Sequence, residues 1–214
     1  MLKEDFYKKY EDNTKVNKII KDFHDLYYES SCIGGTWKNT NWLGVPIQKC
    51  PLDCWIYQEL LFEIKPDIII ETGTKVGGSA LFFASILDLI GKGEIITIDI
   101  DGESKRPIHD RITYLWGSSV DEAVIKFIEP RVKDKKVFII LDSDHSKEHV
   151  LKELEIYSKF VSLNSYIIVE DTNTRGPLGA VFAFIENANN FTIDRSCEKF
   201  YLTFAPYGFL KRVV

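Results

Sequence analysis

Acidic side chains close four of the apolar segments in this 214-residue sequence. They are Glu71, Asp99, Asp142 and the pair Glu170-Asp171. In an open α/β sheet, ligands bind beyond the carboxyl ends of the strands, so acids at these ends would face one site. A single acid after a strand often only starts a turn or caps a helix. Four together predict a site that binds cations, hydroxyl groups or both.

Three of these acids, Asp142, Glu170 and Asp171, could form a metal site. Clustered carboxylates repel one another and raise one another's pKa unless a cation neutralises them. Oxygen ligands select Mg²⁺, Mn²⁺ or Ca²⁺ over zinc. Adjacent residues on a strand point to opposite faces, so Glu170 and Asp171 share a target only if the chain turns there. Asn173 and Gly176 indicate such a turn.

His145 lies three residues after Asp142, where we expect a helix to begin. A histidine beside a metal could remove the proton of a hydroxyl group as a general base. A bound Mg²⁺ would assist by holding two vicinal oxygens of a substrate and lowering the pKa of its hydroxyl. The alternative is that His145 caps the helix or orients Asp142.

A glycine-containing turn follows the first apolar run. Residues 68–79 are IIIETGTKVGGS, and the apolar segment Ala80–Ile90 comes next. This pattern predicts a buried strand, a tight turn and a packed helix. The dinucleotide-binding spacing counted from Gly73 would need a second glycine where Lys75 stands. Glu71 would repel a pyrophosphate but would favour a cationic ligand, so the turn favours S-adenosylmethionine over NAD or ATP.

Asp99 ends the next strand, where an acid can accept hydrogen bonds from the ribose hydroxyls of an adenosine. This placement suits S-adenosylmethionine and NAD alike. Ser118 follows the third strand at the same edge of the sheet, and it could flank the adenine.

Strands and helices alternate through the middle of the sequence, which predicts an α/β fold with a mostly parallel, twisted sheet and helices on both faces. After residue 190 the pattern changes. Phe191–Asp194 and Phe200–Phe204 are two short apolar segments with no helix between them, so we expect them to pair as an antiparallel C-terminal hairpin.

The N-terminal part differs from this core. Apolar residues recur at helical spacing over Lys15–Tyr28, which predicts an amphipathic helix that could pack on a neighbour or a second subunit. Residues 30–51 form a loop whose Trp37 and Trp42 either cover a site or fill gaps in the core. We therefore expect a helical extension over residues 1–36, a single domain over residues 37–214, and a possible homo-oligomer.

The bulk properties exclude several classes. A net charge of -5 argues against sequence-independent binding to nucleic acid. The longest apolar run is too short to span a membrane, and the N-terminus lacks the apolar segment of a signal peptide. The four cysteines form no C-x-x-C pair. We expect a cytoplasmic protein with reduced thiols and no membrane partner.

The sequence resembles the cephalosporin hydroxylase family, which is related to the macrocin-type, metal-dependent O-methyltransferases. The resemblance covers most of the chain from about Trp42 to Leu210. The motifs that carry it are KCPLD at 49–53, KPDIIIETGT at 65–74, GGS at 77–79, TID at 97–99, LDSDHS at 141–146 and VEDTN at 169–173. Further support comes from GP at 176–177, AV at 180–181 and PYGFL at 206–210.

The resemblance implies a Rossmann-like class I methyltransferase fold that uses S-adenosylmethionine and Mg²⁺ or Mn²⁺. It implies that His145 is the catalytic base. The implied metal ligands are Asp142, Glu170 and Asp171. The implied cofactor-binding residues are Glu71, Gly73, Gly78, Ser79, Asp99, Ser118 and Asp142.

The leading prediction is therefore an Mg²⁺-dependent O-methyltransferase that acts on a sugar or a sugar-bearing metabolite. One alternative is an oxidoreductase or hydroxylase, as the family name suggests. Another is a module that binds a metabolite without turnover. The sequence leaves the acceptor and its methylated position open.

Overall fold

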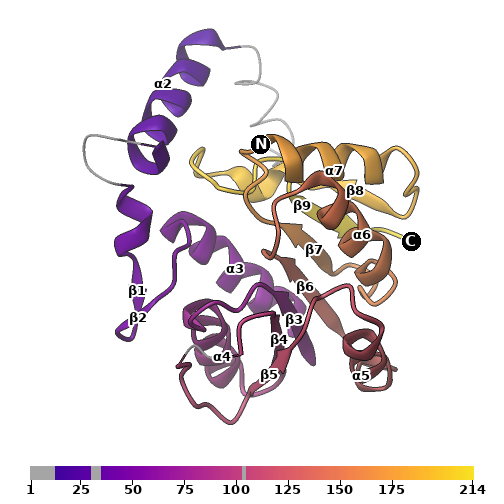
Figure 1. The fold of residues 1–214 in the computed structure, drawn as a ribbon. Helices are drawn as coiled ribbons and strands as arrows, with labels where there is room; N and C mark the ends of the chain where they lie inside the picture. The colour runs from indigo at the N-terminus through magenta and orange to yellow at the C-terminus, as the bar shows by residue number, and fades with distance from the viewer. Residues whose placement is uncertain (1–12, 30–34, 103–104) are drawn as a thin grey trace.

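A single seven-stranded sheet forms the centre of the computed structural model, which describes residues 13–29, 35–102 and 105–214 (Figure 1). The strand order is β5-β4-β3-β6-β7-β9-β8. The strands are β3 (Ile68–Thr72), β4 (Glu94–Asp99), β5 (Ile112–Trp116), β6 (Val137–Leu141), β7 (Tyr166–Val169), β8 (Phe191–Ile193) and β9 (Phe209–Arg212). Strands β3 to β7 pair in parallel, whereas β9 is antiparallel to both of its neighbours.

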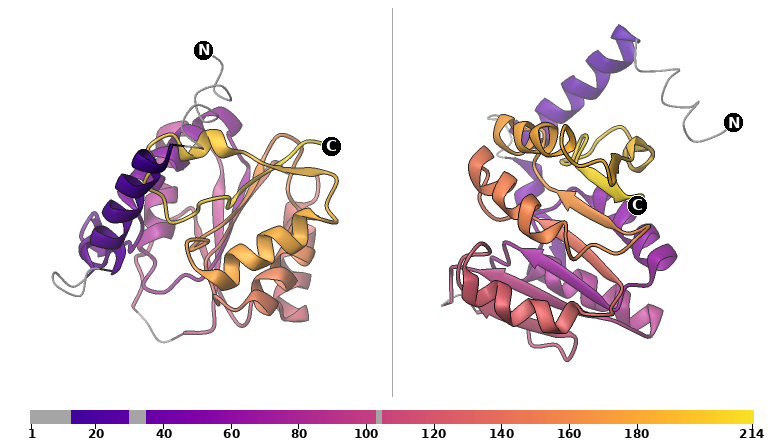
Figure 2. Two further views of the ribbon diagram at one scale, coloured as in Figure 1. Left: turned by 90° about the horizontal axis from the view of Figure 1, so that it is seen from above. Right: turned by 90° about the vertical axis from the view of Figure 1, so that its right-hand side faces the viewer.

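Helices cover both faces of the sheet (Figure 2). They are α3 (Pro51–Ile64), α4 (Gly78–Ile90), α5 (Glu122–Val132), α6 (Lys147–Tyr157) and α7 (Arg175–Ile185). Ile68 and Ile70 of β3 pack against α5, α6 and α7, whereas Ile69 faces α3 and α4. Both β3 and β6 are buried along their whole length. Strand β6 is accordingly a continuous apolar run, whereas β3 begins with three isoleucines and ends in the buried polar residues Glu71 and Thr72. The predicted α/β architecture is confirmed.

The predicted C-terminal hairpin is correct in type but wrong in its second strand. Strand β8 pairs with β9, where Phe191 lies opposite Arg212. The segment Phe200–Phe204 is a loop instead: Tyr201 adopts a left-handed backbone conformation with φ of 67°, which interrupts an extended strand. Phe204 packs in a small cluster with Cys50 and donates its backbone N–H to Asp53 Oδ2 at 2.8 Å.

The N-terminal helix is present as α2 (Thr14–His24), which continues as a π-helical turn over Asp25–Glu29. It projects from the domain in Figure 1, and no residue of α2 is buried. Its apolar face leaves Ile19 and Phe23 exposed. Whether this face contacts a second subunit stays a prediction, as does the proposed division of the chain at residue 36. None of the described helices is long and apolar enough to cross a membrane.

The tryptophan-containing loop has two different roles. Residues 30–34 lie outside the described residues, and a short hairpin of β1 (Asn41–Trp42) and β2 (Val45–Pro46) precedes α3. Trp42 donates its indole N–H to Ser85 Oγ at 3.1 Å and meets Phe82 edge-on, so it fills a gap against α4. Trp37 lies instead at the wall of the large cavity described next.

Candidate active site

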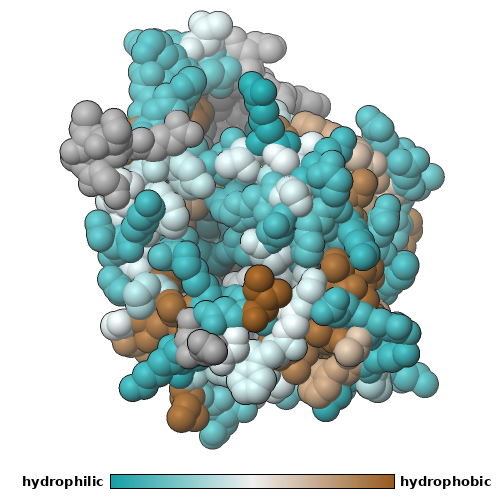
Figure 3. All heavy atoms as spheres, viewed as in Figure 1, coloured by the Kyte–Doolittle hydropathy of each residue, from teal (hydrophilic) through white to brown (hydrophobic). Residues whose placement is uncertain are grey.

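A cavity of about 540 Å³ opens at the carboxyl ends of the parallel strands. The loops that follow β3, β4, β5, β6 and β7 all contribute to its wall. Figure 3 shows a hollowed and largely hydrophilic region on this face of the molecule. Its volume lies in the range of sites that hold a cofactor or a drug-sized ligand.

Nine of the ten residues that the sequence singled out for a site line this cavity. They are Gly73, Gly78, Ser79, Asp99, Ser118, Asp142, His145, Glu170 and Asp171. Glu71 is the exception, and it lies beneath the surface of the cavity. The prediction that ligands bind at the strand ends therefore identified the cavity correctly. It did not reveal that Glu71 is buried, whereas the other nine residues line the cavity.

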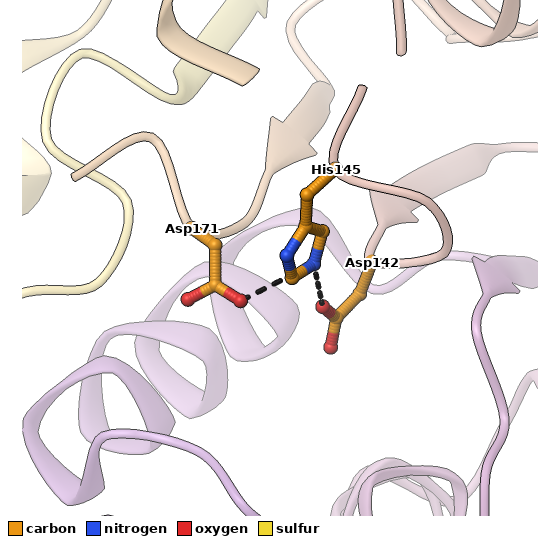
Figure 4. Close-up of side chains that lie close together, drawn as sticks. All are labelled: Asp142, His145 and Asp171. Atoms are coloured by element: carbon orange, nitrogen blue, oxygen red, sulfur yellow. Dashed lines mark ion pairs between the residues drawn. The ribbon is translucent and has the colours of Figure 1, made fainter. Parts of the chain in front are cut away.

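Asp142, His145 and Asp171 meet at one edge of the cavity, with the imidazole between the two carboxylates (Figure 4). His145 Nε2 lies 3.3 Å from Asp171 Oδ2 and 3.7 Å from Asp142 Oδ1. Among the described residues, these three offer ligand atoms that all lie within 4.8 Å of one another. Asp171 has a φ of 52°, so the chain turns after β7, and the Asp171 carboxylate joins this group while Glu170 does not.

The electrostatics of this group indicate a shortage of positive charge. Burial and the nearby carboxylates of Asp142 and Glu170 raise the pKa of Asp171 to about 7. The hydrogen bond with Asp142 raises the pKa of His145 above its usual value, although partial burial opposes this. A cation placed among these groups would stabilise the ionised carboxylates. The donor set thus fits a divalent cation.

Lys49 is a member of the site that the sequence reasoning missed. Its side chain is only 3% exposed, and Nζ lies 2.7 Å from both Asp142 Oδ2 and Glu170 Oε1. Tyr57 donates its hydroxyl to the same Glu170 oxygen. Burial lowers the pKa of Lys49, but the carboxylates outweigh it and hold the pKa well above its usual range. The KCPLD motif at 49–53 contains this lysine, but nothing in the motif identifies its partners.

Two glycines allow close backbone contacts around the site. Gly73 has a φ of +88°, and a Cβ atom there would lie 1.9 Å from the carbonyl oxygen of Asp142. A Cβ atom on Gly78 would lie 2.1 Å from the carbonyl oxygen of Pro46. These positions therefore require glycine because backbone meets backbone, whether or not a ligand is bound.

Asp99 is held at the other side of the cavity by the glycine turn and by the turn that follows Asp99 itself. Its Oδ2 accepts the backbone N–H of Lys75 at 2.6 Å, and its Oδ1 accepts that of Asp101 at 2.8 Å. Ile100 beside it is 81% exposed although it lines the cavity, and Ser118 lines the same wall. An acid, a hydroxyl group and an exposed aliphatic side chain together suit a ribose and a flat base.

Residues 34–213 match the family described as Rhamnosyl O-methyltransferase/CmcI. This chain belongs to that family. The prediction of the CmcI-type, cephalosporin hydroxylase-like family and of a methyltransferase is thereby confirmed.

Relatives within the family include the rhamnosyl O-methyltransferases of Mycobacterium bovis and Mycobacterium tuberculosis. Each is 35% identical over 213 residues, and the match covers 91% of this chain and 85% of the relative. The rhamnosyl O-methyltransferase of Mycobacterium leprae is 34% identical over 92% of this chain and 91% of the relative.

Solved structures of CmcI share the fold of this family member. The structure described as "cmcI-D160 Mg-SAM" superposes with a TM-score of 0.67 at 20% identity, covering 83% of this chain and 78% of the other. The CmcI apo-structure gives a TM-score of 0.69 at 20% identity, with 87% and 82% covered. The predicted class I methyltransferase fold is confirmed.

Glu71 has a supporting position in this fold. Its side chain is fully buried, and its Oε2 accepts the hydroxyl of Thr97 at 2.6 Å. Thr97 in turn shares a hydrogen bond of 2.6 Å with Thr74 in the glycine turn. Burial raises the pKa of Glu71 from 4.5 to about 7, although Lys49 partly offsets this.

The burial of Glu71 predicts a pH-dependent stability. Between pH 4.5 and 7 the folded protein keeps the Glu71 proton that the unfolded chain releases, so its contribution falls as pH rises. A shift of this size corresponds to roughly 3 kcal/mol. Urea unfolding at pH 5 and pH 8 should therefore show a smaller loss of stability in Glu71→Gln than in the wild type. The exposed Glu129→Gln variant is the control, and an equal loss in all three proteins would contradict this account.

Proposed function

We propose that this chain transfers the methyl group of S-adenosylmethionine to a hydroxyl oxygen of a rhamnosyl unit, with a divalent cation such as Mg²⁺ at the acidic group. The observation that carries the proposal is the meeting of Asp142, His145 and Asp171 in the cavity whose other wall holds Asp99. Two facts support it: the relatives at 34–35% identity are rhamnosyl O-methyltransferases, and a CmcI structure is described with Mg and SAM.

The wall around Asp99 is the proposed cofactor side. Asp99 would accept hydrogen bonds from the ribose hydroxyls, Ile100 would pack on the adenine, and Ser118 would flank it. When bound, S-adenosylmethionine supplies a methyl group activated by its positively charged sulfur. Asp142 faces that charge from the end of β6. Glu71 supports the glycine turn through Thr97 and Thr74.

Asp142, Glu170 and Asp171 are the proposed metal ligands. Asp142 and Asp171 are already grouped with His145, whereas Glu170 is engaged by Lys49 and Tyr57. When bound, the cation supplies positive charge that orients the acceptor oxygens and lowers the pKa of the attacking hydroxyl. His145 is 45% exposed in its side chain and is therefore accessible to take that proton.

An aromatic wall supports a sugar ring as the acceptor. Trp37 and Phe204 line the same cavity as the acidic group. Trp37 stacks on Tyr28 with ring centroids 5.5 Å apart and meets Phe204 edge-on at 6.3 Å. Such rigid apolar faces suit the C–H face of a deoxysugar, while the acids bind its hydroxyls.

The hydroxylase alternative finds less support in the ligand set. A non-haem iron oxygenase uses two histidines and one carboxylate. The group of described residues that can hold a metal has one histidine and two carboxylates. Oxygen-rich ligands favour Mg²⁺ or Mn²⁺ instead.

Asp99→Ala is expected to weaken the binding of S-adenosylhomocysteine about 10²-fold, because two hydrogen bonds to a charged acceptor are lost. Isothermal titration calorimetry with S-adenosylhomocysteine in the presence of Mg²⁺ measures this. Asp101→Ala, which changes an exposed acid in the same turn, should bind as the wild type does. Equal affinities for Asp99→Ala and the wild type would remove Asp99 from the cofactor site.

A further inference from the structure

A buried lysine bridges two of the proposed metal ligands. Lys49 immediately precedes Cys50, the residue that caps α3, and its Nζ makes ion pairs of 2.7 Å with Asp142 and with Glu170. The two carboxylates come from the ends of different strands, β6 and β7. The single positive charge of Lys49 thus pairs with both carboxylates.

The surroundings of Lys49 explain why a charge is needed there. Glu170 is 4% exposed, and its Oε1 receives both the lysine and the Tyr57 hydroxyl. Asp142 turns its other oxygen toward His145. Removing one partner of a buried ion pair leaves an uncompensated charge and is strongly destabilising. Without a metal, these acids would repel one another if the lysine were absent.

We propose that Lys49 is a positioning residue that acts as an internal cation: it holds Asp142 and Glu170 together in the metal-free protein and competes with the divalent cation for them. This inference rests on the proposed metal site. The lysine ammonium would repel a divalent ion near these carboxylates, and Glu170 would have to give up its contact with Lys49 to bind such an ion.

Two opposite consequences follow from replacing Lys49 by an uncharged side chain of similar length. The metal-free protein loses the charge that compensates Asp142 and Glu170, so it should become less stable. The site becomes more negative by one charge, so it should bind a divalent cation more tightly. A lysine that only filled space would produce neither effect once methionine filled the same space.

The test compares Lys49→Met with the wild type after removal of metal with EDTA. We expect the melting temperature of the metal-free variant to fall by about 10 °C, and most of the loss to be recovered in MgCl₂. Calorimetric titration with MgCl₂ should show a dissociation constant at least about tenfold lower than that of the wild type. Lys92→Met is the matched control, because it removes a lysine from a 2.8 Å ion pair with Asp67 that is partly exposed.

The double variant Lys49→Met/Glu170→Gln separates charge from packing. It should regain the melting temperature of the metal-free wild type, because the loss of one positive and one negative charge restores the net charge of the group. It should also lose the tighter binding of Mg²⁺. If Lys49→Met does not fold, a folded double variant supports the proposal and an unfolded one overturns it. Unchanged stability and affinity in Lys49→Met, or weaker binding of Mg²⁺, would also overturn it.

The same experiment keeps the two proposals apart. If neither the wild type nor Lys49→Met binds Mg²⁺, the proposed metal site fails. The melting temperatures without metal then decide the role of Lys49 alone: a fall in Lys49→Met with recovery in the double variant supports the bridge between the two acids, and equal values refute it.

Discussion

Asp142→Ala is expected to lower the rate of methyl transfer by at least about 10³-fold, because it removes a proposed metal ligand and part of the field around the reacting groups. Asp142 links two side chains of the site: its Oδ2 pairs with Lys49, and its Oδ1 pairs with His145. The rate is measured with labelled S-adenosylmethionine at saturating Mg²⁺, and binding of Mg²⁺ by calorimetry should be lost in parallel.

Glu148→Ala provides the control for that loss. Glu148 is an exposed acid in the first turn of α6, and it is not among the residues that line the cavity. Its replacement should leave the rate within about threefold of the wild type, because exposed side chains away from a site usually contribute little energy. Full methyl transfer by Asp142→Ala in the presence of a chelator would contradict the metal-dependent mechanism.

His145→Gln is expected to lower kcat by about 10² to 10⁴-fold, the range typical for the loss of a general base. Because His145 would act on the proton of the acceptor, binding of S-adenosylhomocysteine and of Mg²⁺ should stay close to wild-type values. Steady-state kinetics and calorimetry on the same preparation measure the two effects. His109→Gln, whose ring contacts Asp88, is the control variant.

The His145 result also decides between the roles left open by the sequence. If His145→Gln loses Mg²⁺ binding together with activity, the histidine acts as a ligand or as the group that orients Asp142. If kcat is retained, His145 is not the base. Only a loss of kcat with both ligands still bound supports proton transfer by this residue.

The sheet and most of the cavity could be predicted because their signals are local. Strands buried on both faces need continuous apolar runs, and the acid that follows such a run marks its carboxyl end, as Asp142 follows β6. Parallel pairing then gathers these ends at one edge. The turn at Asp171 was also predicted, because Asn173 and Gly176 follow it in the sequence.

The remaining features depend on contacts that no local pattern contains. Lys49 meets Asp142 and Glu170 across 93 and 121 positions of sequence, and nothing near Lys49 identifies these partners. Phe200–Phe204 is apolar enough for a strand, but Leu202 and Phe204 pack in the cluster around Cys50, and the backbone N–H of Phe204 is bound by Asp53. Glu71 comes at the end of an apolar run, where an acid is expected to bind a ligand, but its side chain is fully buried.

The most direct test of the proposed function is mass spectrometry of the acceptor after incubation with S-(trideuteromethyl)-adenosylmethionine, Mg²⁺ and a rhamnosyl substrate. We predict one trideuteromethyl group on a sugar oxygen, with product formation lost in EDTA and in Asp142→Ala. Methylation that continues undiminished in EDTA would contradict the role of the acidic group. A wild-type protein that binds S-adenosylhomocysteine but leaves rhamnosyl acceptors unmethylated would contradict the proposed acceptor.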